Sequence, residues 1–277
     1  MSIVTMNFES QYLHSSHEVS IILPNRPRDV DARKYYAGGA RYKVLWLLHG
    51  TFGDHTDWLR RTNIELYAGE KDLIVVMPSA LNSNYSNWDR AMLGYGMYDY
   101  LTEELMPLIY NWFPASGKRE DNFIAGLSMG GRGAIKYAVN HPDKFAAAAI
   151  LSAAPVDFSA LTEEDLTKDD PFSQRMKGMV DNAGGLDAFV NSNENVWAIM
   201  NALAGTGTLP KLLFACGTAD KPIYDNLLLF QEHAGRIGLE AEFWTLEGFR
   251  HEWRFWDLAI QQALEFFGLE DSGASPF

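Results

Sequence analysis

The chain of 277 residues contains a single cysteine, Cys216. One cysteine cannot close a disulfide within the chain, and it excludes a zinc site built from several thiolates. No stretch approaches the roughly 18 consecutive apolar residues of a membrane-spanning helix, and the N-terminus lacks a basic segment followed by an apolar one. We therefore expect a soluble, cytoplasmic protein, or a secreted one if a signal peptide has been removed.

Positive charge is also scarce. The chain has 23 lysine and arginine residues and 36 aspartate and glutamate residues, which gives a formal net charge of −13. This charge repels the phosphates of nucleic acids and the head groups of anionic lipids, so we expect neither nucleic acid nor a membrane as a partner. Hydrophobic residues make up 47% of the chain, enough to build the core of a single domain over residues 1–277.

Short apolar segments recur along the chain and predict strands. Two of them near the N-terminus predict a hairpin, and six later runs without strict alternation are typical of strands buried on both faces of a parallel sheet. The expected strands span residues 3–8, 18–23, 44–48, 73–77, 122–127, 145–151, 211–216 and 241–246.

Between these strands, apolar residues recur every three or four positions, which predicts helices. The alternating order of strands and helices predicts an α/β fold with a mostly parallel, doubly wound sheet of about eight strands and helices on both faces. Two long segments, 79–97 and 156–210, interrupt this order, and we expect them to form the walls of a cleft. The helices are expected at residues 58–67, 98–112, 129–140, 222–237 and 253–267.

The segment Gly126-Leu127-Ser128-Met129-Gly130 carries the clearest chemical signal. It matches the pattern G-x-S-x-G between a predicted strand and a predicted helix, which is typical of the turn that exposes a nucleophilic serine. Small residues two positions before and after Ser128 leave room for a strained backbone. We therefore predict that Ser128 is a nucleophile; the alternative is a glycine-rich turn with an incidental serine.

A nucleophilic serine needs a histidine as its base and a carboxylate that orients the histidine, in the chain order serine, acid, histidine. His251 follows the predicted strand 241–246 and is the expected base, whereas His233, the alternative, lies within a predicted helix. Asp220 follows the strand 211–216 and is the expected acid. Asp157, which follows the strand 145–151, is its rival.

Two backbone N–H groups are needed to stabilise the oxyanion. We expect the first from Met129, the residue after the nucleophile, and the second from Thr51 in the loop His49-Gly50-Thr51-Phe52-Gly53. The glycines of this loop let the backbone approach a substrate closely. The chemistry requires no metal and no organic cofactor, and we expect neither.

Together with LLHGTFGDHTDWLRRTNIE, FACGTADKPIYDNLLLF and GFRHEWRFWDLAI, these motifs resemble the esterase D-like branch of the α/β-hydrolases, and most of all its tributyrin esterase group. The resemblance implies the α/β-hydrolase fold, a triad of Ser128, Asp220 and His251, and a cap over the acyl pocket formed by the insertion 156–210. S-formylglutathione hydrolases of this family carry a cysteine after the His-Gly pair. This chain has none there, which argues against a glutathione thioester as substrate.

Aromatic residues gather in the segments that are expected to line the cleft, and their flat faces suit sugar rings and phenolic acyl groups. Packing in the core is the alternative for these side chains, above all for Trp253, which lies two positions after His251. The side chains expected to contact the substrate are Phe52, Trp58, Tyr85, Trp88, Tyr95, Trp197 and Trp253.

The sequence thus predicts a serine carboxylesterase that hydrolyses short-chain acyl or hydroxycinnamoyl esters, such as acetyl or feruloyl esters of plant polysaccharides, through an acyl-enzyme. Its expected partner is a small-molecule ester, acylated sugars included, and a homo-oligomer is compatible with the sequence. Three alternatives stay open: an acyltransferase, a thioesterase like the S-formylglutathione hydrolases, and a noncatalytic binding protein that keeps the hydrolase scaffold.

Overall fold

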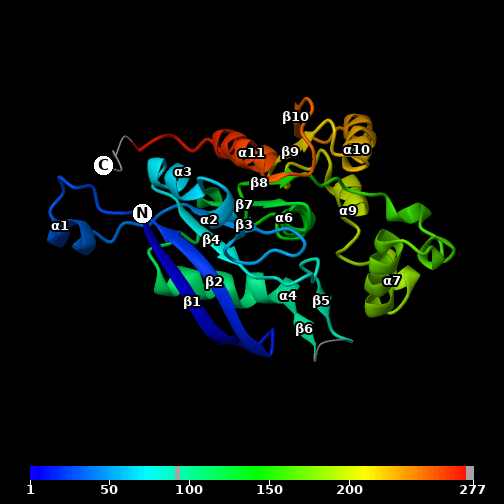
Figure 1. Cartoon of the computed structure of the whole chain (residues 1–277), viewed down its shortest axis with the longest axis horizontal. Coiled ribbons are helices and arrows are strands. Elements are labelled where there is room, and N and C mark those ends of the chain that lie inside the picture. Colours follow the sequence, from blue (N-terminus) through cyan, green and yellow to red (C-terminus); the bar gives the residue numbers. More distant parts are fainter. Residues whose placement is uncertain (91–93, 273–277) are drawn as a thin grey trace.

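The computed structural model describes residues 1–90 and 94–272 (Figure 1). Within these ranges one sheet of eight strands has the order β1-β2-β4-β3-β7-β8-β9-β10. The pairs β1/β2 and β2/β4 are antiparallel, and the other neighbours are parallel. The predicted mostly parallel, doubly wound sheet is therefore confirmed. Its strands are β1 (Ser2–Ser10), β2 (Ser15–Leu23), β3 (Val44–Leu48), β4 (Ile74–Pro78), β7 (Asn122–Leu127), β8 (Ala147–Leu151), β9 (Lys211–Gly217) and β10 (Glu242–Leu246).

The central strand β3 shows why the apolar runs lack alternation. All five of its residues are buried: Trp46 and Leu48 belong to the core on one face of the sheet, and Leu45 and Leu47 to the core on the other. Helices supply the second layer of each core. On the first face lie α5 (Met106–Trp112), α6 (Met129–Asn140) and α10 (Ile223–Ile237), and on the second lie α3 (Ile64–Glu70) and α11 (Trp253–Phe266) (Figure 1).

Two predicted helices differ from the observed ones. The segment 58–67 forms two helices, α2 (Asp57–Arg61) and α3, because Thr62 is extended and its hydroxyl contacts the carbonyl of Trp58 and the N–H of Ile64. The segment 98–112 is helical but changes form: α4 (Met97–Asp99) is followed by a π-helical stretch (Tyr100–Leu105) and α5. Pro107 has no N–H to donate to the preceding turn, which weakens a regular α-helix there.

The two long segments contain secondary structure of their own. Residues 79–97 carry a small antiparallel pair, β5 (Asn87–Trp88) and β6 (Tyr95–Gly96); residues 91–93 of this segment lie outside the described ranges. The insertion 156–210 carries α7 (Pro171–Ala183), α8 (Leu186–Val190) and α9 (Val196–Leu203), and it has a small core around Met176 and Phe189. In Figure 1, α7 lies on the side of the molecule away from both chain ends.

The remaining helical elements are short. In the part of the chain that the structure describes, each helix is too short or too polar to span a lipid bilayer. The short elements are α1 (Ala32–Ala37) and the 3-10 turns Arg119–Asp121, Phe158–Ala160 and Asp165–Thr167.

Candidate active site

Ser128 lies in the turn between the end of β7 and the start of α6. Its backbone has φ 53° and ψ −114°, a conformation that costs energy for a residue with a side chain, and its N–H donates to the carbonyl of Leu151 at 2.8 Å. A Cβ atom added to Gly126 would lie 2.3 Å from the carbonyl oxygen of Gly130. The turn therefore closes only because glycine stands at these positions, as the sequence pattern predicts.

The loop after β3 lies directly against this turn. A Cβ atom on Gly130 would lie 2.5 Å from the carbonyl oxygen of Leu48, and one on Gly50 would lie 3.6 Å from the Cβ of Ser128. Thr51 follows Gly50 in this loop, and Met129 is the first residue of α6. The backbone groups predicted to stabilise an oxyanion thus belong to segments that are packed beside Ser128.

His251 and Asp220 are paired at the same edge of the sheet. The Nδ1 atom of His251 lies 2.8 Å from Oδ2 of Asp220, whose side chain is 3% exposed, against 38% for that of His251. The N–H of Ala219 donates to the carbonyl of Phe249 at 3.0 Å and ties the loop after β9 to the loop after β10. Burial in the protein and the neighbouring carboxylate of Asp220 raise the pKa of the Cys216 thiol to about 12, so this cysteine is protonated at neutral pH.

The rivals of this pair lie elsewhere. Asp157 is exposed, and its Oδ1 accepts from the N–H and the hydroxyl of Ser159 at the start of a 3-10 turn. His233 stacks on Trp197, with ring centroids 4.1 Å apart, and contacts Asn201. Of the two acids and two histidines that the sequence offers, the structure brings together Asp220 and His251.

A chain of contacts connects His251 with the surroundings of Ser128. The ring of His251 meets that of Trp256 edge to face, with centroids 4.9 Å apart, and the indole N–H of Trp256 donates to the hydroxyl of Ser152 at 3.0 Å. Ser152 and Ser128 line the same cavity of about 250 Å³. Ser128, Asp220 and His251 thus all lie at the carboxyl edge of the parallel strands, where ligands bind in open α/β sheets.

Two arginines that the sequence analysis does not predict also line this cavity, Arg132 and Arg175. Arg132 lies in α6, one turn after Ser128, so its place beside the turn follows from helical spacing. Arg175 comes from α7 in the insertion, and its Nη1 donates to the hydroxyl of Thr51 at 3.1 Å. Nothing in the sequence near Arg175 indicates this contact.

Residues 10–210 match the family model described as "Putative esterase". The chain belongs to this esterase family. An acetyl esterase of Caldicellulosiruptor saccharolyticus is 28% identical over 96% of this chain and 98% of its own length. Two solved Staphylococcus aureus structures, the fluorophosphonate-binding serine hydrolase FphF and the S-formylglutathione hydrolase FrmB, are each 31% identical over 96% of this chain and 98% of theirs, with TM-scores of 0.78 and 0.76.

These similarities confirm the esterase resemblance, the α/β-hydrolase fold and the assignment as a carboxylic ester hydrolase. The roles predicted for Ser128, Asp220, His251, Thr51 and Met129 rest on the geometry of the site.

Three of the seven aromatic residues that were expected to line the cleft are buried, so the prediction that they contact substrate is wrong. Trp58 is 1% exposed and donates its indole N–H to the carbonyl of Leu48, and Tyr85 is 0% exposed and donates its hydroxyl to the carbonyl of His49. Tyr95 is 4% exposed and packs in the core between the sheet and its helices. Buried rings cannot contact a substrate. Trp58 and Tyr85 instead donate hydrogen bonds to the carbonyl groups of Leu48 and His49, at the start of the loop 49–53.

The other four aromatic residues are more accessible. Phe52 is 92% exposed, and its N–H donates to Asn82 at 2.9 Å. Trp88 is half-buried against Ser83 and lines a second cavity beside the insertion. Trp253 packs edge to face on Trp58 and Trp256, and Trp197 packs on Phe230 and His233 between α9 and α10. A contact of these four residues with substrate remains a prediction.

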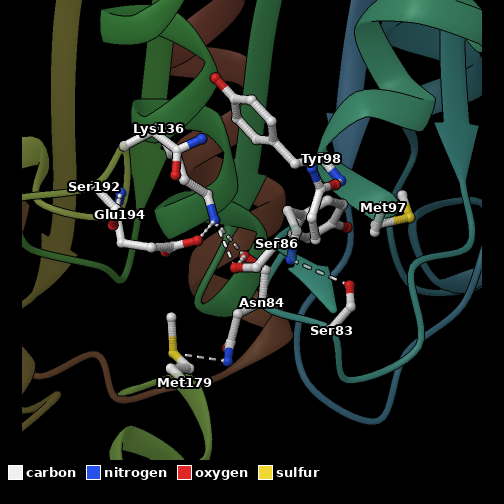
Figure 2. A network of polar contacts seen from close by, with 12 residues as sticks. Ser83, Asn84, Ser86, Met97, Tyr98, Lys136, Met179, Ser192 and Glu194 are labelled. Carbon is white, nitrogen blue, oxygen red and sulfur yellow. Dashed lines mark hydrogen bonds and ion pairs between the residues drawn. The ribbon is translucent and has the colours of Figure 1, made fainter. Parts of the chain in front are cut away.

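A buried lysine joins the insertion to α6, the helix that follows Ser128. Figure 2 shows the ammonium group of Lys136 in α6 directed at three oxygens: Oε1 of Glu194 in the insertion at 2.8 Å, the hydroxyl of Ser86 at 2.7 Å and the carbonyl of Asn84 at 3.1 Å. Desolvation lowers the pKa of Lys136, and the carboxylate of Glu194 opposes that effect. The contact joins α6, the segment 79–97 and the insertion around one charge.

Proposed function

We propose that this esterase hydrolyses short-chain acyl esters through an acyl-enzyme, with Ser128 as nucleophile, His251 as base and Asp220 as the acid that orients the imidazole. One observation carries the proposal: Ser128 occupies a strained turn at the same sheet edge where Asp220 and His251 are paired at 2.8 Å. A serine hydroxyl is a weak nucleophile, and it is activated by a base that a third group orients.

In the proposed mechanism, the Ser128 oxygen attacks the ester carbonyl while His251 accepts its proton. The N–H groups of Thr51 and Met129 stabilise the resulting oxyanion. His251 then donates the proton to the leaving alcohol, and a water molecule repeats the sequence to release the acid. Asp220 keeps Nδ1 of His251 protonated, so that the other ring nitrogen faces the serine as acceptor.

The size of the cavity and the nature of the relatives support a short acyl group. The cavity around Ser128 measures about 250 Å³, which suits a small acyl chain better than a long one. The related Caldicellulosiruptor saccharolyticus protein is an acetyl esterase. We propose that the insertion 156–210 caps this cavity, because Pro171 and Arg175 of α7 contribute to its wall.

Thioester hydrolysis is the second candidate, because one relative of 31% identity is an S-formylglutathione hydrolase. The loop His49-Gly50-Thr51-Phe52-Gly53 contains no cysteine, so we rank this candidate below ester hydrolysis. A panel of acetyl, butyryl, octanoyl and feruloyl esters together with S-formylglutathione separates the candidates, the hydroxycinnamoyl esters included. Product analysis with added alcohols separates hydrolysis from acyl transfer.

The decisive experiment is the Ser128→Ala variant. We expect it to lose hydrolysis of p-nitrophenyl acetate and covalent labelling by a fluorophosphonate probe, with the fold intact by circular dichroism. Ser16→Ala, at an exposed position of β2, is the matched control and should keep both. If Ser128→Ala still turns over the ester or is still labelled, the proposed nucleophile is wrong. If the wild-type protein hydrolyses the ester but is not labelled, the proposed serine mechanism is wrong.

A further inference from the structure

The cavity around Ser128 has an unusual charge. Two guanidinium groups line it, that of Arg132 from α6 and that of Arg175 from α7, and the described residues that line it include no aspartate or glutamate. The rest of the wall is made of apolar and neutral polar residues, among them Ser152 and Asn226. A protein with a net charge of −13 thus places two positive groups at its candidate nucleophile.

Arg175 is only partly satisfied by the protein. Its Nη1 donates to the hydroxyl of Thr51 at 3.1 Å, whereas its Nη2 is buried and has no hydrogen-bond partner among the described residues. A buried charged donor without a partner is costly, and proteins usually avoid it. Nη2 is thus an unsatisfied donor on a side chain that lines the cavity.

Both groups carry their charge at neutral pH. Burial, together with the positive charge of Arg175, lowers the pKa of Arg132 to about 10, which still leaves it protonated at pH 7. Burial likewise lowers the pKa of Arg175. Two like charges that are partly removed from water repel each other, and an anion between them relieves both the repulsion and the loss of hydration.

We propose that Arg132 and Arg175 bind an anionic group of the substrate, so that the preferred ester carries a negative charge near its scissile bond. The proposal rests on the proposed function of Ser128. Guanidinium groups present planar pairs of N–H donors that match carboxylate oxygens, and such charge-assisted hydrogen bonds are stronger than neutral ones. Arg132 also lines the neighbouring, mostly apolar cavity between α6 and the insertion, whereas Arg175 lines only the cavity around Ser128 of these two.

The first test compares pairs of esters that differ only in charge. Monoethyl succinate and ethyl succinamate place a carboxylate or its neutral amide in the acyl part, and 3-acetoxybenzoate and 3-acetoxybenzamide do so in the alcohol part. We expect kcat/KM of the wild-type enzyme to be at least about tenfold higher for the charged member of one pair. The pair that shows the preference identifies the part of the ester that carries the anion. Equal kcat/KM within both pairs overturns the proposal.

The second test assigns the preference to the arginines. Arg132→Gln and Arg175→Gln should each lower the ratio of charged to neutral kcat/KM about tenfold or more, and Arg175→Lys should retain part of it. Arg33→Gln, at an exposed position of α1, is the control and should leave the ratio unchanged. A role of Arg175 only in positioning Thr51 would lower hydrolysis of both members equally. That result, or a ratio that survives in both Gln variants, overturns the proposal.

Failure of this inference is distinct from failure of the proposed function. If the wild-type enzyme hydrolyses neutral and charged esters alike and Ser128→Ala does not, the anion site is wrong and the nucleophile stands. If neither kind of ester is hydrolysed and no fluorophosphonate label is bound, the proposed function itself is wrong. The comparison of substrates needs no variant, so a variant that fails to fold does not prevent the test.

Discussion

His251 Nδ1 lies 2.8 Å from Oδ2 of Asp220, although 31 residues separate the two in the chain. Asp220 is buried in the turn after β9, and His251 is exposed in the loop after β10. A buried carboxylate that contacts one nitrogen of a more accessible imidazole fixes the orientation and the tautomer of the ring. This contact selects Asp220 over Asp157, the other acid that the sequence allows as partner of His251.

We expect Asp220→Asn to lower kcat for p-nitrophenyl acetate by about 10³- to 10⁴-fold, because an amide at this place favours the wrong tautomer of His251. Asp157→Asn should change kcat less than about twofold, since Asp157 is exposed and accepts hydrogen bonds from Ser159 in its own 3-10 turn. Steady-state kinetics of the two variants measure this difference. A larger loss in Asp157→Asn would assign the acid to the other strand end.

Gly130→Ala should destabilise the protein by about 1 to 3 kcal/mol and impair hydrolysis, because the new methyl group would meet the carbonyl oxygens of Leu48 and His49 at 2.5 and 2.6 Å. The matched control is Gly235→Ala in α10, where an added Cβ meets nothing within 4 Å. Gly235→Ala should stabilise the protein by about 0.5 to 1 kcal/mol through helix propensity. Urea unfolding measures both, and equal effects would contradict the steric argument.

Lys136→Met should lower the free energy of unfolding by about 3 to 5 kcal/mol, because it leaves Glu194 without its buried partner. The control Lys177→Met removes the exposed pair with Asp181 in α7 and should change stability by less than about 0.5 kcal/mol. Adding Glu194→Leu to Lys136→Met should restore part of the loss. If the Lys136 variant is as stable as the Lys177 variant, the buried pair does not fix the insertion.

Acid should destabilise the protein through His49. Burial lowers the pKa of His49 below its ordinary value of 6.5, and its Nε2 accepts the N–H of Ala80 at 2.8 Å while Nδ1 contacts the carbonyl of Gly50. The folded state thus requires a neutral ring. Below about pH 6.5 the unfolded state binds more protons than the folded state, so the free energy of unfolding falls as pH falls, by at most about 1.4 kcal/mol per pH unit for one histidine.

Urea unfolding between pH 7.5 and 5 measures this dependence. His49→Gln should flatten it, because the Gln side-chain carbonyl can still accept the Ala80 N–H but does not titrate. His14→Gln, in the exposed turn between β1 and β2, should leave it unchanged. Burial also lowers the pKa values of His17 and His141, so part of the acid destabilisation should persist in His49→Gln. A pH dependence identical to that of the wild type would contradict the assignment.

Local patterns in the sequence are sufficient to predict the strands of the sheet and the turn at Ser128. An apolar run such as Val44–Leu48 is buried on both faces wherever helices cover both faces. Gly126 is required by its close approach to Gly130 within one strand-turn-helix unit, whereas Gly130 is required by the carbonyl groups of Leu48 and His49 in the neighbouring segment. Helix boundaries depend on more than apolar periodicity. A hydroxyl at Thr62 and a proline at position 107 change the helices through individual hydrogen bonds that apolar periodicity does not register.

The sequence alone determined the α/β architecture, the strained serine turn and the esterase family, because strand and helix periodicity and turn chemistry act over a few neighbouring residues. Only the tertiary structure decided that Asp220 and not Asp157 meets His251, that Trp58, Tyr85 and Tyr95 are buried, and that Arg175 reaches Thr51. These outcomes depend on which remote segments pack together. Burial and pairing are properties of that packing. The residues next to a position in the sequence do not indicate which remote segment will cover it.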